Sequence, residues 1–185
     1  WRCLGQEKEW VAPKKRYTGM TEKGVWVMFR EMRRKDRALT PAEAAKILAE
    51  GTYGVLSLNG RNENDYAYGV PVGYAMDESR IYIHCAPTGE KIDRVHGNNR
   101  VSFCVVGAVD VLADKFATNY ASVIAFGQAA EVDDADEKRK ALLAFLDKYS
   151  TDFKESGTRY IENAGPQTKV LRINVEHVTG KARQG

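Results

Sequence analysis

Apolar residues follow a helical spacing at two places in the chain. Near residue 40, the run Thr40-Pro41-Ala42-Glu43 is a typical helix start. The threonine can cap the helix, the proline suits its first position, and the glutamate can reach back to the cap. The apolar stripe that follows is Ala44, Ala45, Ile47 and Leu48, and Gly51 suits the exit from the helix.

A second amphipathic helix is predicted after Asp134, because Glu137 stands three residues later as a capping-box acid. Its apolar stripe is Leu142, Leu143, Phe145, Leu146 and Tyr149. A short helix is also expected after residue 89, carrying Ile92 and Val95. Residues 150–167 are polar and lack a regular period, so we expect irregular structure there, with room for one short helix.

Alternating or continuous apolar runs predict six strands, each bounded by turn-forming residues. The predicted ranges are 53–58, 66–74, 80–86, 101–106, 122–132 and about 171–176. Pro71 interrupts the second strand and cannot donate a backbone hydrogen bond, so that strand must lie at a sheet edge or be bulged there.

The predicted strands are mostly consecutive in sequence, and the helices lie at the ends or between hairpins. A doubly wound parallel sheet needs strict alternation of strands and helices, so that fold is disfavoured. We expect a mainly β protein, with an antiparallel barrel and flanking helices. With 185 residues the chain is long enough for one such domain.

The first 27 residues differ in composition from the rest. All three tryptophans, Trp1, Trp10 and Trp26, lie before Met28. We expect residues 1–27 to be an extension upstream of a natural start at Met28, and residues 28–185 to form the domain. The alternative is an N-terminal arm that wraps the domain.

Charge is distributed unevenly along the chain. The formal net charge is +3, but residues 1–37 hold eleven Lys/Arg against five Asp/Glu, so the remainder is mildly acidic. A nucleic-acid-binding domain usually carries a basic face, so no nucleic-acid partner is expected. No apolar run approaches the length of a membrane span, and no membrane partner is expected. The three cysteines, Cys3, Cys85 and Cys104, form no CxxC pair, which favours reduced thiols, no metal site and a cytoplasmic protein.

The loop Thr88-Gly89-Glu90-Lys91 is a candidate anion site, because it leads from a predicted strand into a helix N-terminus. Gly89 would let the backbone approach an anion, and Lys91 adds a positive charge. The alternative is a solvated turn with a surface lysine. His84, at the end of the preceding strand, could hold a hydrogen-bonding or anionic substrate, or could be a structural histidine.

A third candidate is the segment 66–74, which holds three tyrosines and two glycines around Pro71. Such a strand can bring backbone close to a flat ligand, although a twisted edge strand with half-buried tyrosines explains it equally. No Ser-His-Asp or Cys-His arrangement and no carboxylate pair is visible. If the protein is an enzyme, a cofactor must therefore carry the reaction.

Taken in order, these segments resemble a known family. The motifs are Tyr68-Gly69-Val70-Pro71-Val72, Ile81-Tyr82-Ile83-His84-Cys85-Ala86, Gly89-Glu90-Lys91-Ile92, Asn99-Arg100-Val101-Ser102-Phe103, Thr118-Asn119-Tyr120-Ala121-Ser122-Val123, Gly127-Gln128-Ala129 and Thr179-Gly180-Lys181-Ala182. The series, over roughly residues 28–183, resembles the pyridoxamine phosphate oxidase-like FMN-binding split-barrel proteins, and within them the nitroimidazole-resistance (Nim-type) group.

The resemblance implies a six-stranded antiparallel FMN-binding split barrel that forms a homodimer, with FMN at the subunit interface. It implies that Tyr68, Gly69, Val70, Pro71 and Val72 lie along the isoalloxazine ring, with Cys85 beside them. Gly89 and Lys91 would receive the phosphate. His84 would be the catalytic residue facing the substrate, and Tyr120, Ser122 and Val123 would reach the flavin from the partner subunit.

One motif departs from the family pattern. True pyridoxamine phosphate oxidases carry an Arg-Lys pair at the phosphate loop, where this chain has Glu90-Lys91. Their C-terminal arginine-rich substrate motif is also missing. Because lysine cannot replace the bidentate geometry of arginine, vitamin B6 oxidation is disfavoured and FMN binding is expected to be weaker.

The function expected from this resemblance is an FMN-dependent oxidoreductase that passes electrons from reduced flavin to a small-molecule, electron-poor acceptor such as a nitroimidazole. The alternatives are a non-catalytic flavin-binding or sensing protein, a pyridoxamine phosphate oxidase-like enzyme with another substrate, and a relative that uses deazaflavin or haem.

Overall fold

A computed structural model describes residues 17–20 and 26–185. Most of the predicted extension, residues 1–16 and 21–25, lies outside this described part, so its start at Met28 stays a prediction. Near the N-terminus, β1 (Tyr17–Met20) and β2 (Trp26–Met28) pair as a small antiparallel sheet.

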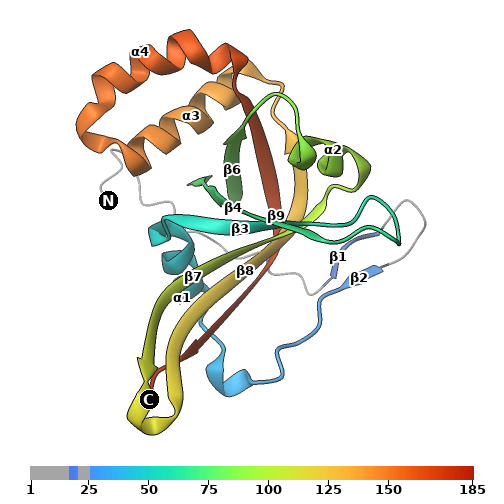
Figure 1. Cartoon of the computed structure of the whole chain (residues 1–185), viewed down its shortest axis with the longest axis vertical. Helices are drawn as coiled ribbons and strands as arrows, with labels where there is room; N and C mark the ends of the chain where they lie inside the picture. Colours follow the sequence, from blue (N-terminus) through green and yellow to red (C-terminus); the bar gives the residue numbers. More distant parts are fainter. Residues whose placement is uncertain (1–16, 21–25) are drawn as a thin grey trace.

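The body of the protein is one strongly curled antiparallel sheet, in the order β4-β3-β7-β8-β9-β6-β5 (Figure 1). The mainly β, split-barrel expectation is confirmed, but the sheet has seven strands where six were predicted. The predicted strand 66–74 ends earlier, and after Tyr74 the chain starts a separate short strand on the opposite edge. The strands are β3 (Tyr53–Leu58), β4 (Tyr68–Gly73), β5 (Ala75–Asp77), β6 (Arg80–Cys85), β7 (Arg100–Leu112), β8 (Ala117–Glu131) and β9 (Lys169–Arg183).

The edge position of Pro71 is confirmed. Its strand, β4, pairs only with β3, so the missing backbone donor costs no ladder hydrogen bond. Because β4 and β5 are joined only by Tyr74, the two edges of the sheet approach each other and nearly close the barrel. The Tyr74 side chain is fully buried and donates a hydrogen bond of 2.5 Å to the Leu48 carbonyl oxygen.

Four α-helices flank the sheet. The predicted capping box is present at α1 (Pro41–Glu50), where the Glu43 side chain accepts from the Thr40 backbone at 2.7 Å. The predicted cap is also present at α3 (Ala135–Tyr149), where Asp134 accepts from the Glu137 backbone at 2.7 Å. The other two helices are α2 (Glu90–Gly97) and α4 (Lys154–Ala164). Short 3-10 turns lie before α1 at Lys35–Arg37, between β7 and β8 at Ala113–Lys115, and on either side of α4 at Thr151–Phe153 and Gly165–Gln167.

The helix α4 is longer than expected, because residues 150–167 were predicted to be mostly irregular. Its sequence shows only a weak apolar stripe, and in the structure it buries no residue completely. It packs against α3 as a helical hairpin beside β6 (Figure 1).

Strand β6 is buried on both faces and links two apolar clusters. On one face, Ile81 and Ile83 join the barrel core around Leu56 and Phe103. On the other face, Tyr82 packs under α3 in a smaller cluster. The strand therefore fixes the position of His84, at its exposed end, relative to both layers.

The strands β7, β8 and β9 continue far beyond the barrel (Figure 1). Strand β7 was predicted to end at residue 106 and β8 to begin at residue 122, but they extend to Leu112 and Ala117 because they pair with each other, and β8 also pairs with β9 as far as Tyr120. We call this projecting part, residues 106–122 and 179–183, the arm.

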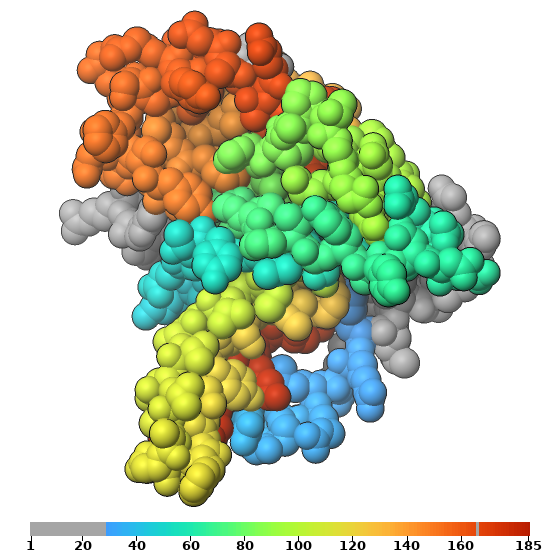
Figure 2. Space-filling model, in the orientation of Figure 1, coloured from blue at the N-terminus to red at the C-terminus, as the bar shows by residue number. Residues whose placement is uncertain are grey.

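Residues 29–39 run beside β9. Phe29 stacks on His177 with ring centroids 4.3 Å apart, and the Leu39 backbone donates to the Gly180 carbonyl oxygen at 3.0 Å. In Figure 2 this blue segment passes beside the red and yellow strands of the arm. His177 is half-buried beside the Phe29 ring.

Candidate functional site

The entrance to α2 has the backbone geometry of an anion-binding turn. Gly89, its N-cap, has φ 132° and ψ 174°, a region that only glycine adopts without strain, and open space surrounds the position of a Cβ. Lys91 follows in the first helical turn and, within the described residues, makes no ion pair. The helix N-terminus thus presents backbone donors together with an unpaired cation.

Cys85 ends β6 close to this turn. It is half-buried against the barrel core, and burial raises the pKa of its thiol while the nearby charge of Lys91 opposes that change. The Cys85 thiol therefore stays protonated near neutral pH and acts as a packing residue beside the cation.

A buried arginine that the sequence analysis missed holds α2 against the neighbouring loop. Only 6% of Arg94 is exposed. Its guanidinium donates to the carbonyl oxygens of Asn59 and Tyr66 at 2.8 and 2.9 Å and lies 3.1 Å from an Asp65 carboxylate oxygen. These contacts tie the helix to the loop between β3 and β4.

The same guanidinium connects both predicted parts of the flavin site. It donates to Glu90 at 2.7 Å and lies 5.3 Å from the centre of the Tyr68 ring, at the start of β4. Glu90 departs from the Arg-Lys pair of the family. Its carboxylate accepts a hydrogen bond from Arg94 of the same chain. The one sequence signal for Arg94 was the position of a basic residue between the buried positions Ile92 and Val95.

Strand β4 presents a flat face to the outside. Tyr68, Val70 and Val72 are half-buried against the core, while the exposed alternate positions are Gly69, Pro71 and Gly73. These exposed residues carry little or no side chain. As an edge strand, β4 also has backbone N–H and C=O groups on its outer side that no strand pairs.

His84 lies where β6 meets the helical hairpin. Its ring packs edge-on against Phe145, with centroids 4.7 Å apart. Burial lowers the pKa of the imidazole below its usual value, so His84 is neutral at pH 7. It lines a cavity of about 790 Å³ between Gly73 of β4 and the hairpin α3–α4.

The remaining predicted residues lie in the arm. Tyr120 accepts a 3.4 Å hydrogen bond from Arg37, which lowers the pKa of its hydroxyl, and Lys181 lies 5.7 Å from its ring centre. Ser122 is opposite Lys181 in the sheet. The Val123 side chain points the other way and is fully buried in the core of its own chain, so only its backbone can meet a ligand.

One chain does not bring these two groups together. His84 pairs with Val170 near the start of β9, and Tyr120 pairs with Arg183 at its end. At about 3.3 Å per residue, they are separated by roughly 40 Å along the strand. Gly89, Lys91, His84 and β4 therefore lie at the barrel, whereas Tyr120 and Ser122 lie in the arm.

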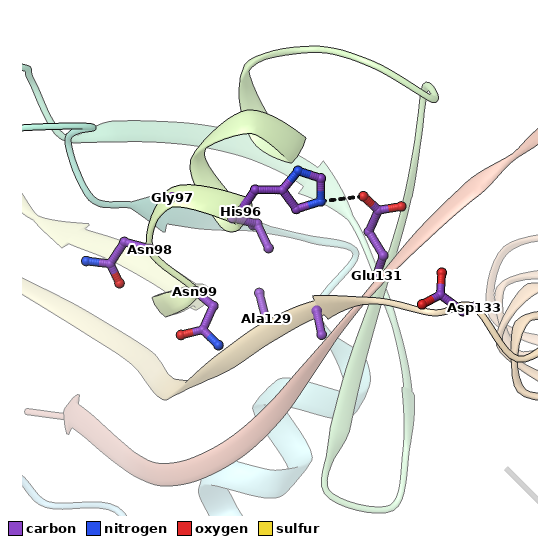
Figure 3. Close-up of a pocket in the computed structure, with 9 residues that line it drawn as sticks. His96, Gly97, Asn98, Asn99, Ala129, Glu131 and Asp133 are labelled. Carbon is purple, nitrogen blue, oxygen red and sulfur yellow. Dashed lines mark hydrogen bonds and ion pairs between the residues drawn. The ribbon is translucent and has the colours of Figure 1, made fainter. Parts of the chain in front are cut away.

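Two further hollows contain none of the predicted residues. The polar one, about 640 Å³, lies between the end of α2 and β8 (Figure 3). There His96 contacts Glu131 at 2.7 Å, and the other Glu131 oxygen is paired with Lys169, so both carboxylate oxygens are occupied. The second hollow, about 320 Å³, lies beside Phe29 and Phe126.

Neither a metal site nor a membrane-spanning helix is found among the residues that the structure describes. No group of His, Cys, Asp and Glu there is placed to hold a metal ion. Among the same residues, no helix is long and apolar enough to cross a membrane.

The strongly curled antiparallel sheet with its flanking helices has the architecture of a split barrel. The family model described as pyridoxamine 5'-phosphate oxidase matches residues 40–182. The chain therefore belongs to the pyridoxamine 5'-phosphate oxidase-like family.

Solved structures share this fold at low sequence identity. A candidate 5-nitroimidazole antibiotic resistance protein from Bacteroides thetaiotaomicron is 21% identical, with a TM-score of 0.66 over 78% of this chain and 86% of that one. The flavocytochrome Anf3 from Azotobacter vinelandii is 19% identical, with a TM-score of 0.63 over 84% and 73%. An FAD-binding protein from Mesorhizobium loti is 22% identical, with a TM-score of 0.58 over 80% and 98%. No curated protein matches the chain.

Proposed function

We propose that this protein is an FMN-dependent oxidoreductase that passes electrons from reduced flavin to a small, electron-poor acceptor, and that it works as a homodimer. The observation that carries the proposal is the glycine-led turn with Lys91 at the α2 entrance, which Arg94 links to the start of β4. A flavin supplies the redox chemistry, and the chain supplies binding and orientation.

The α2 entrance fits a phosphate monoester. Gly89 lets the backbone donors of the first helical turn face an anion, and Lys91 has no competing carboxylate among the described residues. Glu90 would repel a phosphate if it were free, but its hydrogen bond with Arg94 offsets its charge. Lys91 is thus the cation proposed to hold the FMN phosphate.

The exposed face of β4 fits a flat ring system. Gly69, Pro71 and Gly73 leave backbone at the surface, and the unpaired edge can bond the polar rim of an isoalloxazine. His84 has no hydrogen-bond partner among the described residues, so its neutral ring can bind the acceptor beside the flavin. The flavocytochrome and the FAD-binding protein of the same fold support a flavin as the first cofactor to test.

The homodimer is supported by the arm. Residues that pair across antiparallel strands share a face, so Val106 and Val109 lie on the same face as Ser122 and Tyr120. The two valines are 58% and 57% exposed although they are in regular strands. A second copy of the chain would cover this face and bring Tyr120 and Ser122 to the flavin of its partner.

A nitroimidazole is one acceptor to test, because a candidate 5-nitroimidazole resistance protein has the same fold. A second candidate function is a non-catalytic flavin-binding protein. It is favoured by the scarcity of acid–base groups at the site: the titratable side chains that line the cavity are His84 and the phenols of Tyr149 and Tyr160, and only an imidazole ordinarily titrates near neutral pH.

The test is the visible absorbance of the purified protein, alone and titrated with FMN, FAD, deazaflavin and haem. We expect a flavin spectrum with FMN preferred. Protein that stays colourless with FMN would contradict the proposal, and a haem or deazaflavin spectrum would replace the cofactor. Steady-state reduction of a nitroimidazole by the FMN-loaded protein then separates an enzyme from a binding protein.

A further inference from the structure

The cavity beside His84 is built for an uncharged ligand. It lies between the end of β6 and the hairpin α3–α4, and its volume of about 790 Å³ is in the range of pockets for drug-sized molecules. Its lining is mostly aromatic and aliphatic and contains no Asp, Glu, Lys or Arg: the principal residues are Leu142, Phe145, Leu146, Tyr149, Phe153 and Tyr160.

Three basic residues near the cavity are paired with carboxylates, and a fourth, Lys148, has no hydrogen-bond partner among the described residues. Lys154 pairs with Asp147 at 2.6 Å, Arg159 pairs with Glu155, and Lys169 pairs with Glu131. The buried Lys148 ammonium lies 3.6 Å from the centre of the Tyr74 ring and does not line the cavity. A carboxylate or phosphate group on a ligand would therefore find no counter-charge in the cavity.

Most polar atoms of the lining are also satisfied within the chain. The Tyr149 hydroxyl donates to the backbone carbonyl of Thr52 at 2.6 Å. Ser156 and Thr168 donate to the carbonyls of Phe153 and Ala164, each at 3.1 Å. The neutral His84 imidazole, which offers one donor and one acceptor, is left as a free polar group at the inner wall.

We infer that this cavity binds an uncharged, flat, apolar molecule with a hydrogen-bonding group directed at His84, and that it rejects anionic molecules. The inference rests on the proposed function, because it names the class of the acceptor. It also adds a physical reason to expect that a phosphorylated vitamin B6 compound would be a poor substrate: its phosphate would be desolvated without a cation.

A pair of fluorescent probes tests the inference without turnover. N-phenylnaphthylamine is neutral, and anilinonaphthalene sulfonate has the same aromatic skeleton with one sulfonate added. Titrated into the full-length protein, the neutral probe should bind at least about tenfold more tightly than the sulfonate. Equal or reversed affinities would overturn the inference.

Arginine substitutions at the rim of the cavity test whether the probes bind there. Tyr160 and Phe153 line the cavity but are 72% and 68% exposed, so substitution there should preserve the fold. Tyr160→Arg and Phe153→Arg should each tighten the sulfonate and weaken the neutral probe. Asn163→Arg adds the same charge to α4 outside the cavity and should change neither affinity; an equal response in this control would contradict the cavity as the site.

The outcome is separable from that of the flavin proposal, because each probe is titrated with and without FMN. Protein that binds FMN but shows no preference for the neutral probe refutes the neutral cavity while the flavin proposal stands. Protein that prefers the neutral probe at the Tyr160 rim but binds no flavin supports the cavity and refutes the flavin proposal.

Discussion

The two parts of the proposed flavin site are held in opposite ways. Around α2 and β4, the buried guanidinium of Arg94 joins a helix, a loop and an aromatic ring within one chain. In the arm, Tyr120 and Ser122 lie on an exposed sheet face with valines that no described segment covers. The contacts that hold the first part lie within a single chain, whereas we propose that the second part acts through a partner chain.

The first part therefore depends on the stability of the folded chain, and the second depends on the association of two chains. Loss of the Arg94 network should destabilise the folded chain itself, whereas a change in the arm should affect assembly and leave the barrel folded. The predictions below test this separation, from the largest expected effect to the smallest.

The largest effect is expected for Arg94→Met. Removing the guanidinium leaves two buried backbone carbonyls without their donor and takes the nearer cation from Glu90 and the buried cation from Asp65, so the free energy of unfolding should fall by about 3–5 kcal/mol. Chemical denaturation followed by circular dichroism measures the change.

The matched control is Arg61→Met. Arg61 contacts the same acid, Asp65, at 3.0 Å, but its side chain is 56% exposed. Its loss should cost about 1 kcal/mol or less. If the two variants were equally destabilised, Arg94 would have no special role in holding α2.

In the arm, replacing Val106 and Val109 together by Asp should weaken the dimer at least about 100-fold, because two unpaired charges would be buried between the chains. Sedimentation velocity over a range of concentrations measures this. The variant with Thr at both positions keeps the shape without charge and should remain largely dimeric. If the wild-type protein were monomeric at all concentrations, the arm could not contribute to the flavin site of a partner chain.

Gly89→Ala should produce an intermediate effect within the first part. The backbone at φ 132° and ψ 174° is strained for alanine, so we expect a loss of about 1–3 kcal/mol of stability or a shifted turn with weaker FMN binding. Gly97→Ala, in the same helix at negative φ and in open space, should be close to neutral or stabilising. Thermal unfolding of both variants checks the contrast.

Local patterns predicted the elements whose signals are contained in a few neighbouring residues. The caps at Thr40 and Asp134, the short helix after Gly89 and the edge position of Pro71 all follow from backbone chemistry within one turn or strand. The length of the arm was missed, because β7 and β8 are prolonged by pairing with each other, and β8 also pairs with β9, which follows some 40 residues later in the chain.

Site residues were predictable only in part, for a similar reason. The turn at Gly89 and Lys91 carries its own signal, but Arg94 depends on carbonyls of Asn59 and Tyr66, which the fold brings to it. The cavity beside His84 needs α4, whose weak apolar stripe was not recognised as a helix. The roles of Tyr68, Gly69, Val70, Pro71, Val72, His84, Cys85, Gly89, Lys91, Tyr120, Ser122 and Val123 in binding FMN stay predictions.

The most direct test of the account compares the affinities of FMN and riboflavin, which differ only by the phosphate, for the wild-type protein and for Lys91→Ala. A cation bonded to a phosphate contributes about 1.5–3 kcal/mol, so the variant should bind FMN at least about tenfold more weakly while its affinity for riboflavin is unchanged. Equal loss for both ligands, or no loss for FMN, would show that the α2 entrance does not hold the phosphate.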